Sequence, residues 1–395
     1  MSSTSRRDLS NSNKILMDLF SRYYSKADLK LPSDIEFREF AVQPFGSASY
    51  VRHLSFRSPD ELRQYLARKP PLHLYYSSAV YLQPSAPSMD EKGWRGSDLL
   101  FDIDADHIPG CSVQKLYYCP GDSELTREHP GDRCSSIGEV SEVEIIDPQC
   151  IGLAIRQAVM LSDVLVEELG VSRSSMEVTF SGNRGFHIHC YVKDDLRSLG
   201  REERRILVEY IKGSGFSPEA FYKIKSGRAR KTMIMPPRTV DGGIPSRIAR
   251  AYLREERVVD KDVRAYLTGA LQSINKKIFE MLSDMWRKDL YEIYIDEKVT
   301  MDISRLVRIP NSLNGKTGLK AYPVDVSKIE SFEPGPWLSP FEDMKMKIKT
   351  MARIPKINFY GMEFEANIEA YYAVQAPLAI FLALKGVAEI VGIIN

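Results

Sequence analysis

Cysteine is scarce in this chain: 395 residues contain five. Small secreted domains that depend on disulfides are rich in cysteine, so this count excludes a disulfide scaffold. Three cysteines cluster with two histidines, namely Cys111, Cys119 and Cys134 with His107 and His129. Cys150 and Cys190 stand alone in the sequence. Without a secretion signal, such clustering favours metal binding over disulfides.

Net charge is also nearly absent, since 54 basic and 53 acidic side chains leave +1. A protein that binds nucleic acid through bulk charge would be far more basic. Any contact with a polyanion must therefore come from a local basic cleft, with the acids placed elsewhere.

Long apolar runs are missing. The N-terminus is polar and has no apolar signal segment. The longest apolar stretch begins at Ala376 and is interrupted by Pro377, Lys385 and Glu389, so it is too short to cross a bilayer. We expect a terminal element packed on the core, no membrane partner and a cytoplasmic location.

The patterns that are present predict an α/β protein with insertions. Helical apolar spacing covers 13–27, 60–68 and 149–169, the last ended by Gly170. Strands are predicted at 73–82, 99–103 and 298–303, and a strand–turn–strand unit follows at 176–192. Residues 107–140 have little periodicity and indicate a small inserted module, whereas 194–290 are mostly helical and charged, with a basic loop at 223–231.

Two acids share one face of the strand at 99–103. Asp102 and Asp104 lie two apart after an apolar run, and side chains alternate between the faces of a strand. Adjacent carboxylates repel each other, so a divalent ion is their natural occupant. A solvated acidic strand end, extended by Asp106, is the alternative for this motif alone.

The turn at 181–185 joins two strands and reads Ser-Gly-Asn-Arg-Gly. Its glycines allow N–H groups to approach phosphate oxygens, and Ser181 and Arg184 add side-chain donors. His187 and His189 share one face of the following strand. A plain β-hairpin with two half-buried histidines is the equal alternative.

A third acid and further cations follow at 299–319. Asp302 is predicted on a strand, with Arg305 and Arg308 after it. The small-residue loop that carries Asn314 and Lys316 could cradle a triphosphate, although Pro310 excludes a P-loop. Taken alone, this loop favours a surface turn with a few ordinary cations.

Together these segments resemble the archaeo-eukaryotic DNA primase family, catalytic small subunit, archaeal type. The matching segments are WRGSDLLFDIDAD (94–106), FSGNRGFHIH (180–189) and VTMDISRLVRIPNSLNGKTGL (299–319). Phe37–Phe40 and YSSAVY (76–81) extend the match, which is weak across 190–295 and beyond 335. The resemblance implies a mixed sheet flanked by helices, a zinc-binding insertion at 107–140, a mostly helical insertion at 194–295 and a C-terminal extension at 335–395 packed on one catalytic domain spanning 1–395.

The resemblance also implies roles for residues. Asp102, Asp104 and Asp302 match the acids that hold two Mg²⁺ or Mn²⁺ ions during in-line attack on a nucleotide. The nucleotide contacts would be Ser181, Arg184, His187, Arg308, Asn314 and Lys316. Asn314 stands where the family usually has His, and an amide can donate a hydrogen bond but carries no charge.

A structural zinc ion is implied in the inserted module. Cys119, Asp122, His129 and Cys134 form an acceptable mixed ligand set, with Cys111 and His107 as substitutes. The departure is Asp122, which stands where a second Cys is expected. A site that has lost its metal is the alternative.

The expected function is therefore template-directed synthesis of short primers on single-stranded DNA from nucleoside triphosphates, beside a primase large subunit. A repair or translesion polymerase of the same superfamily is one alternative. A non-catalytic nucleic-acid-binding subunit is another, but a pure binder gains nothing from three carboxylates facing a polyanion.

Overall fold

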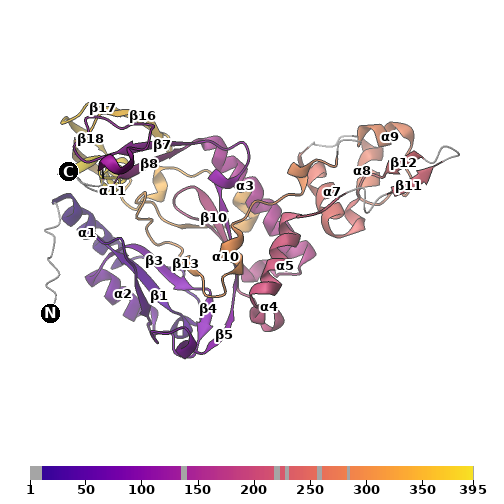
Figure 1. The fold of residues 1–395 in the computed structure, drawn as a ribbon, viewed down its shortest axis with the longest axis horizontal. Helices are drawn as coiled ribbons and strands as arrows, with labels where there is room; N and C mark the ends of the chain where they lie inside the picture. The colour runs from indigo at the N-terminus through magenta and orange to yellow at the C-terminus, as the bar shows by residue number, and fades with distance from the viewer. Residues whose placement is uncertain are drawn as a thin grey trace.

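The computed structural model describes residues 11–134, 140–217, 223–226, 231–255, 260–282 and 285–394. The helices are α1 (Asn11–Tyr24), α2 (Pro59–Arg68), α3 (Pro148–Asp163), α4 (Asp194–Ser198), α5 (Arg201–Lys212), α7 (Gly243–Glu255), α8 (Lys261–Leu267), α9 (Lys276–Met281), α10 (Glu297–Met301) and α11 (Ala376–Leu384). Together with the strands below they form the mixed α/β protein that the sequence predicts (Figure 1).

Two four-stranded sheets form the body of the molecule. One has the order β13–β3–β1–β2, from Leu306–Arg308, Pro71–Ser77, Phe40–Pro44 and Val51–Leu54. The other has the order β14–β9–β10–β6, from Tyr322–Val324, Met176–Phe180, Gly185–Cys190 and Leu99–Asp104. All pairs in both sheets run antiparallel. The segment between β13 and β14 therefore passes from one sheet to the other.

Helix α3 packs on β6 and β10 and is continued by a π-helical turn over Val164–Glu168. Asp147 caps it by accepting a hydrogen bond from the Gln149 amide, with Pro148 at the first helical position. Together, α3 and this turn make a helix of 21 residues, Pro148–Glu168, that is long and apolar enough to cross a membrane, but 61% of its most apolar window is buried in the protein. A core helix of a globular domain explains this pattern.

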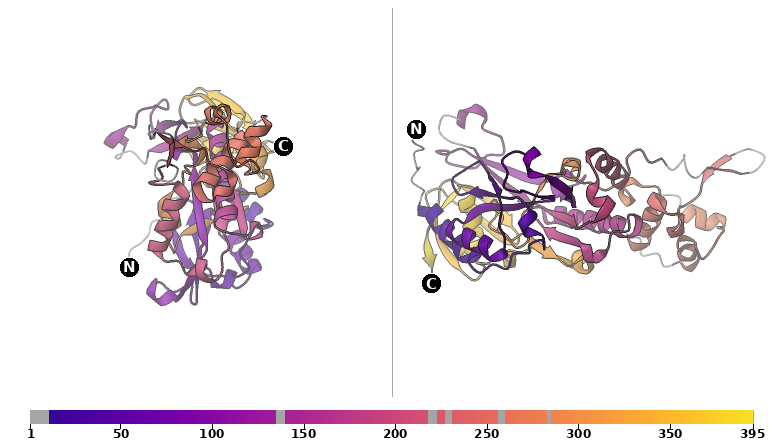
Figure 2. Two further views of the ribbon diagram at one scale, coloured as in Figure 1. Left: turned by 90° about the vertical axis from the view of Figure 1, so that its right-hand side faces the viewer. Right: turned by 90° about the horizontal axis from the view of Figure 1, so that it is seen from below.

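A helical arm extends away from the two sheets (Figures 1 and 2). It carries α7, α8 and α9, and its buried residues form a second hydrophobic cluster that includes Ile248, Leu267 and Leu282. The hairpin of β11 (Lys223–Ser226) and β12 (Lys231–Ile234) lies at its far end. The segment predicted as a basic loop is therefore a hairpin, of which 227–230 lie outside the described residues.

The remaining strands cover the opposite end of the body. β15 (Lys345–Thr350) pairs with β18 (Tyr371–Gln375) and β19 (Ala388–Ile394), while β16 (Ile354–Phe359) and β17 (Met362–Ala366) form a hairpin. Helix α11 is almost wholly buried, as expected for the apolar stretch at 376. Two short hairpins complete the fold: β4 (Ala79–Tyr81) with β5 (Trp94–Ser97), and β7 (Val113–Tyr118) with β8 (Ser141–Ile146).

The strand predicted at 298–303 is wrong: the chain forms the short helix α10 there, and Asp302 is its C-cap. The Asp296 side chain accepts a hydrogen bond from the Lys298 amide and starts the helix. Thr300 then donates to the Leu100 carbonyl oxygen at 2.9 Å, which holds α10 against β6. This tertiary contact overrides the strand preference of the β-branched residues.

Candidate active site

The register between β6 and β10 places an acid opposite a histidine. Asp102 pairs with His187 and Asp104 with Gly185 across the ladder. The His187 Nε2 lies 3.5 Å from an Asp102 carboxylate oxygen. The strand of acids and the strand after the turn, separated by about eighty residues of sequence, thus build one surface. The spacing of Asp102 and Asp104 predicts only that these two acids share a face of their own strand.

In the metal-free protein, the ionised forms of Asp102 and Asp104 on β6 are destabilised. Burial raises the pKa of Asp102 to about 6, against an opposing effect of Arg305. Burial and the neighbouring Asp102 carboxylate raise the pKa of Asp104 to about 6. Both groups would be stabilised by a bound cation, because a cation favours the ionised form.

Arg184 turns toward the acids. Its guanidinium lies 3.2 Å from Asp106, 3.7 Å from Asp104 and 2.5 Å from Glu144 of β8. Burial alone would lower the pKa of Arg184, but Asp104 and Glu144 raise it. In this state Arg184 neutralises the acidic edge and remains within reach of anything bound there.

The third predicted acid, Asp302, is the C-cap of α10 and lines a different hollow from Asp102. The Asp296 amide donates to the Asp102 carbonyl oxygen, which fixes α10 beside β6. Asp302 accepts hydrogen bonds from the amide and hydroxyl of Ser304. It lines a hollow of about 310 Å³ that shares Arg305 with the cavity described next.

A cavity of about 340 Å³ lies between the two sheets, and we call it the cationic cavity. Its chemistry comes from three cations, two imidazoles and one acid: Arg305, Arg308, Lys316, His73, His187 and Asp102. A concave site in which cations surround a single metal-type acid suits a polyphosphate bound to a divalent ion.

His187 is poised in this cavity without a second partner. Its Nδ1 is buried and has no hydrogen bond within the described residues. Burial and Arg308 lower its pKa to about 4, so the ring is neutral near pH 7. A buried polar atom without a partner is costly and is typical of a site that awaits a ligand.

The loop at 312–318 is fastened to the turn at 181–185. The Asn314 amide donates to the Ser181 carbonyl oxygen at 2.9 Å, and its side-chain oxygen accepts from the Lys316 amide. Thr317 donates to the Gly182 carbonyl oxygen at 2.5 Å. Asn314 is 3% exposed and does not line the cationic cavity, whereas Lys316 does. Asn314 therefore holds the loop that carries Lys316.

The turn itself is closed by Ser181, whose hydroxyl oxygen accepts from the amides of Asn183 and Gly185. Gly182 has a φ of +76°, and a Cβ there would lie 2.9 Å from the Lys320 carbonyl oxygen. Gly185 would meet the Ile103 carbonyl oxygen at 2.0 Å. Both glycines are thus required by close backbone approach, as the sequence motif predicts.

One group of side chains in the described residues brings three metal-type ligand atoms within 4.8 Å of one another, namely Asp104, Asp106 and His107. The Oδ1 atom of Asp106 is buried and has no hydrogen-bond partner in the part of the chain that the structure describes. Carboxylate oxygens suit Mg²⁺ and Mn²⁺, so the residues fit a hard divalent ion. Asp106 adds a candidate ligand beyond the three predicted acids.

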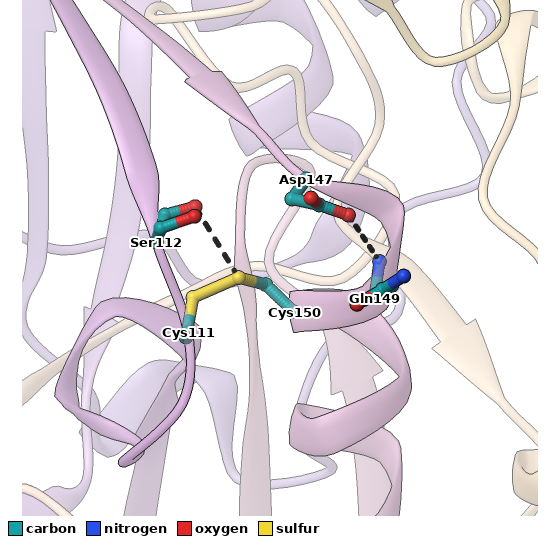
Figure 3. Close-up of a disulfide and its surroundings, with 5 residues drawn as sticks. All are labelled: Cys111, Ser112, Asp147, Gln149 and Cys150. Carbon is teal, nitrogen blue, oxygen red and sulfur yellow. Dashed lines mark hydrogen bonds between the residues drawn. A yellow bond between two sulfur atoms is a disulfide. The ribbon is translucent and has the colours of Figure 1, made fainter.

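The cysteines of the inserted module are paired. Cys119 and Cys134 form one disulfide with a Cα–Cα distance of 5.6 Å, and Cys111 and Cys150 form another at 5.0 Å (Figure 3). The expectation of metal instead of disulfides is corrected for this form, since spacing alone does not give connectivity. Zinc requires thiolates, so Cys119 and Cys134 can bind it only after reduction.

Four residues of the site escaped the sequence analysis as site residues: His73, Tyr75, Arg305 and Glu144. Arg308 donates to the His73 Nδ1 at 2.8 Å and to the Tyr75 hydroxyl at 2.9 Å. His73 and Tyr75 alternate on β3, so their shared face was readable in the sequence. Glu144 had no comparable signal, because only the fold brings β8 to Arg184.

Comparison with known proteins gives a consistent result. The family model described as DNA primase small subunit matches residues 144–326. The DNA primase small subunit PriS of Sulfurisphaera tokodaii is 37% identical, over 96% of this chain and 97% of that protein. Its counterpart from Hyperthermus butylicus is 36% identical, over 95% and 96%.

Among solved structures, the polymerase domain from Mycobacterium tuberculosis Ligase D in complex with DNA is similar at 12% identity. The match covers 82% of this chain and 88% of that chain, with a TM-score of 0.36. A score this low carries no argument about the site.

Proposed function

The chain belongs to the family of DNA primase small subunits, and we propose that the cationic cavity and the acids beside it are its nucleotidyl-transfer site. The protein is an enzyme of DNA replication that makes primers with divalent metal ions. The single observation that carries our proposal is the juxtaposition of Asp102 with Arg305, Arg308 and Lys316 around one cavity.

We assign the metal ligands to Asp102, Asp104 and Asp302, with Asp106 as an additional candidate. Mg²⁺ or Mn²⁺ bound there would lower the pKa of a primer 3′-hydroxyl and neutralise the triphosphate. The carboxylates, with pKa values near 6, are ionised at neutral pH and ready to bind cations. Arg184 already pairs with Asp104 and Asp106, and it is close enough to pair with a phosphate that binds beside them.

The remaining residues orient the nucleotide. Arg308 and Lys316 supply positive charge, and neutral His187 donates or accepts one hydrogen bond at the cavity wall. Ser181 and Asn314 act from outside the cavity, because their hydrogen bonds hold the 181–185 turn and the 312–318 loop in position. Binding in this geometry restricts the triphosphate to one orientation relative to the acids.

The substrates we propose are a single-stranded DNA template and nucleoside triphosphates. We also propose a primase large subunit as partner, a cytoplasmic location and one catalytic domain (1–395) with insertions at 107–140 and 194–295 and an extension at 335–395. A structural zinc ion on Cys119, Asp122, His129 and Cys134 is proposed for the reduced chain. Elemental analysis of protein kept reduced throughout should find about one zinc per chain.

The test is primer synthesis from nucleoside triphosphates on single-stranded DNA with no primer supplied, in Mg²⁺ and in Mn²⁺. Dinucleotide formation by the wild-type chain and none by Asp102→Ala is the expected outcome. Extension of a supplied primer without any initiation, even with a candidate large subunit, would instead indicate a repair or translesion polymerase.

A further inference from the structure

His73 is a buried histidine in the wall of the cationic cavity, and it has no assigned role. It lies on β3 and is 8% exposed. Its Nδ1 lies 2.8 Å from an Arg308 guanidinium nitrogen and 3.3 Å from the Gly315 amide nitrogen. Both neighbours are obligate donors, so Nδ1 must be the acceptor and the ring proton must sit on Nε2.

The Nε2–H is left free by the protein. It has no hydrogen-bond partner among the described residues, although its ring faces a polar cavity. A Cβ added to Gly315 would lie 3.0 Å from Nε2. The same Cβ would lie 2.7 Å from the Leu72 carbonyl oxygen, so this position requires glycine, and residue 315 places no side chain in the space beside Nε2.

The surroundings decide which ligand can use that donor. Arg308 and Lys316 lie beside the ring, and burial together with these cations lowers the pKa of His73 to about 2. The imidazole is therefore neutral and does not add charge. A donor surrounded by cations selects an anionic acceptor, and phosphate oxygens fit it.

We propose that the Nε2–H of His73 donates a hydrogen bond to a non-bridging phosphate oxygen of the bound nucleoside triphosphate, next to Arg308 and Lys316. This inference rests on the proposed function, because it names one more contact in the same site. Asn314, whose position in the sequence suggested a triphosphate contact, is buried and bonded to Ser181 and Lys316 instead.

The competing explanation is that His73 only positions Arg308. The two explanations differ in a double-mutant cycle. If His73 contacts the phosphate directly, removing His73 weakens phosphate binding by the same factor with or without Arg308. If His73 acts through Arg308, removing it has no effect on binding in an Arg308→Ala background.

The experiment measures binding of inorganic tripolyphosphate by calorimetry in Mg²⁺, and KM and kcat for nucleotide incorporation, on the full chain. The variants are His73→Ala, His73→Gln, Arg308→Ala and the double alanine variant. His53→Ala is the matched control, since His53 is a half-buried histidine that does not line the cavity.

We expect His73→Ala to weaken tripolyphosphate binding about tenfold and to raise KM by a similar factor, with kcat within about twofold. His73→Gln should retain most of the affinity, because its amide can both accept and donate. The loss should persist in the Arg308→Ala background. Unchanged tripolyphosphate affinity in His73→Ala, or a loss that vanishes without Arg308, would overturn the proposal.

Two further outcomes are informative. If His73→Ala does not fold, the ¹⁵N resonance of the wild-type His73 Nε2 carries the test: it must shift on addition of tripolyphosphate, and an unmoved resonance refutes the contact. If the wild-type chain binds tripolyphosphate through His73 but incorporates no nucleotide, the proposed function fails while this anion contact stands.

Discussion

The cleft between the sheets and the base of the helical arm both bury charge, but in opposite ways. At the base of the arm, Arg247 is fully engaged: its guanidinium pairs with Glu168 at 3.0 Å and donates to the carbonyl oxygens of Ile211 and Tyr291. In the cleft, burial raises the pKa of Asp102 and Asp104, the Asp102 carboxylate raises that of Asp104 further, and the buried Nδ1 of His187 has no hydrogen-bond partner among the described residues. Charges that hold the fold are satisfied internally, whereas charges kept for a ligand are left incomplete.

The largest expected effect is on chemistry in the cleft. Asp102→Ala, Asp104→Ala and Asp302→Ala should each lower the rate of nucleotide incorporation by about 10³-fold or more, because a metal ligand is lost. Circular dichroism should show an intact fold. Near wild-type incorporation by Asp302→Ala would remove it from the ligand set and make Asp106 the third acid.

The converse expectation holds at the base of the arm. Arg247→Ala should lower the free energy of unfolding by about 2–3 kcal/mol, since it leaves the buried Glu168 with only Arg250 and the Tyr210 hydroxyl as partners among the described residues. Incorporation per folded molecule should stay unchanged. If Arg247→Ala kept its melting temperature and lost activity, Arg247 would serve the reaction and not the stability of the fold.

The next largest effect is expected on triphosphate binding in the cleft. Arg184→Ala and His187→Ala should each raise KM for the triphosphate about tenfold, because each removes a group available to phosphate oxygens. Template affinity, measured by fluorescence anisotropy on single-stranded DNA, should change much less. Equal losses for both ligands would count against the assignment of these residues to the nucleotide.

The incomplete charges should also cost stability in the metal-free chain. The folded pKa of Asp104, about 6, lies above its ordinary value, so the folded state keeps a proton that the unfolded state has released. Stability should therefore fall as pH rises from about 4 to 6 and stay lower above that range. Asp104→Asn should stabilise the protein at pH 8 by about 1–2 kcal/mol, after allowance for its partial exposure.

Thermal unfolding in EDTA measures this effect, with the exposed Asp90→Asn as control. Mg²⁺ should abolish the advantage of Asp104→Asn by stabilising the wild-type carboxylate. An asparagine variant that is no more stable than wild type in EDTA would show that the acid is already compensated in the fold.

The smallest effect should come from the far end of the arm. Replacing Lys223, Lys225 and Lys231 of the β11–β12 hairpin by glutamine should reduce the salt dependence of single-stranded DNA binding by about 2 in slope, if each lysine contacts one phosphate. Triphosphate affinity should not change. An unchanged slope would mean that the hairpin is solvated surface and that the template path lies elsewhere.

The sequence predicted the parts of this site that depend on local patterns. Alternation on 99–104 put Asp102 and Asp104 on one face, and the glycines of 181–185 predicted the turn that joins β9 to β10. It did not predict α10, because the β-branched Val299 and Thr300 favour a strand unless the contact with β6 is known. The Asp296 cap was the available signal.

Pairing over distance was out of reach for the same reason. His73 becomes a site residue only because β13 pairs with β3 and brings Arg308 beside it. The disulfides were not predicted, because clustered Cys and His in a chain without a secretion signal favoured metal binding. Apart from Cys119–Cys134, whose partners are 15 residues apart, each failure concerns a contact between segments that the sequence separates widely.

The two disulfides also give the inserted module a covalent topology of its own. The Cys119–Cys134 ring lies inside the larger ring closed by Cys111 and Cys150, whose partners are 39 residues apart. The Cys111–Cys150 disulfide thus joins the two ends of the module, one shortly after the acids of β6 and the other at the start of α3. A single protease cut anywhere inside the larger ring would leave one covalent molecule, and its two fragments would separate on a gel only after reduction.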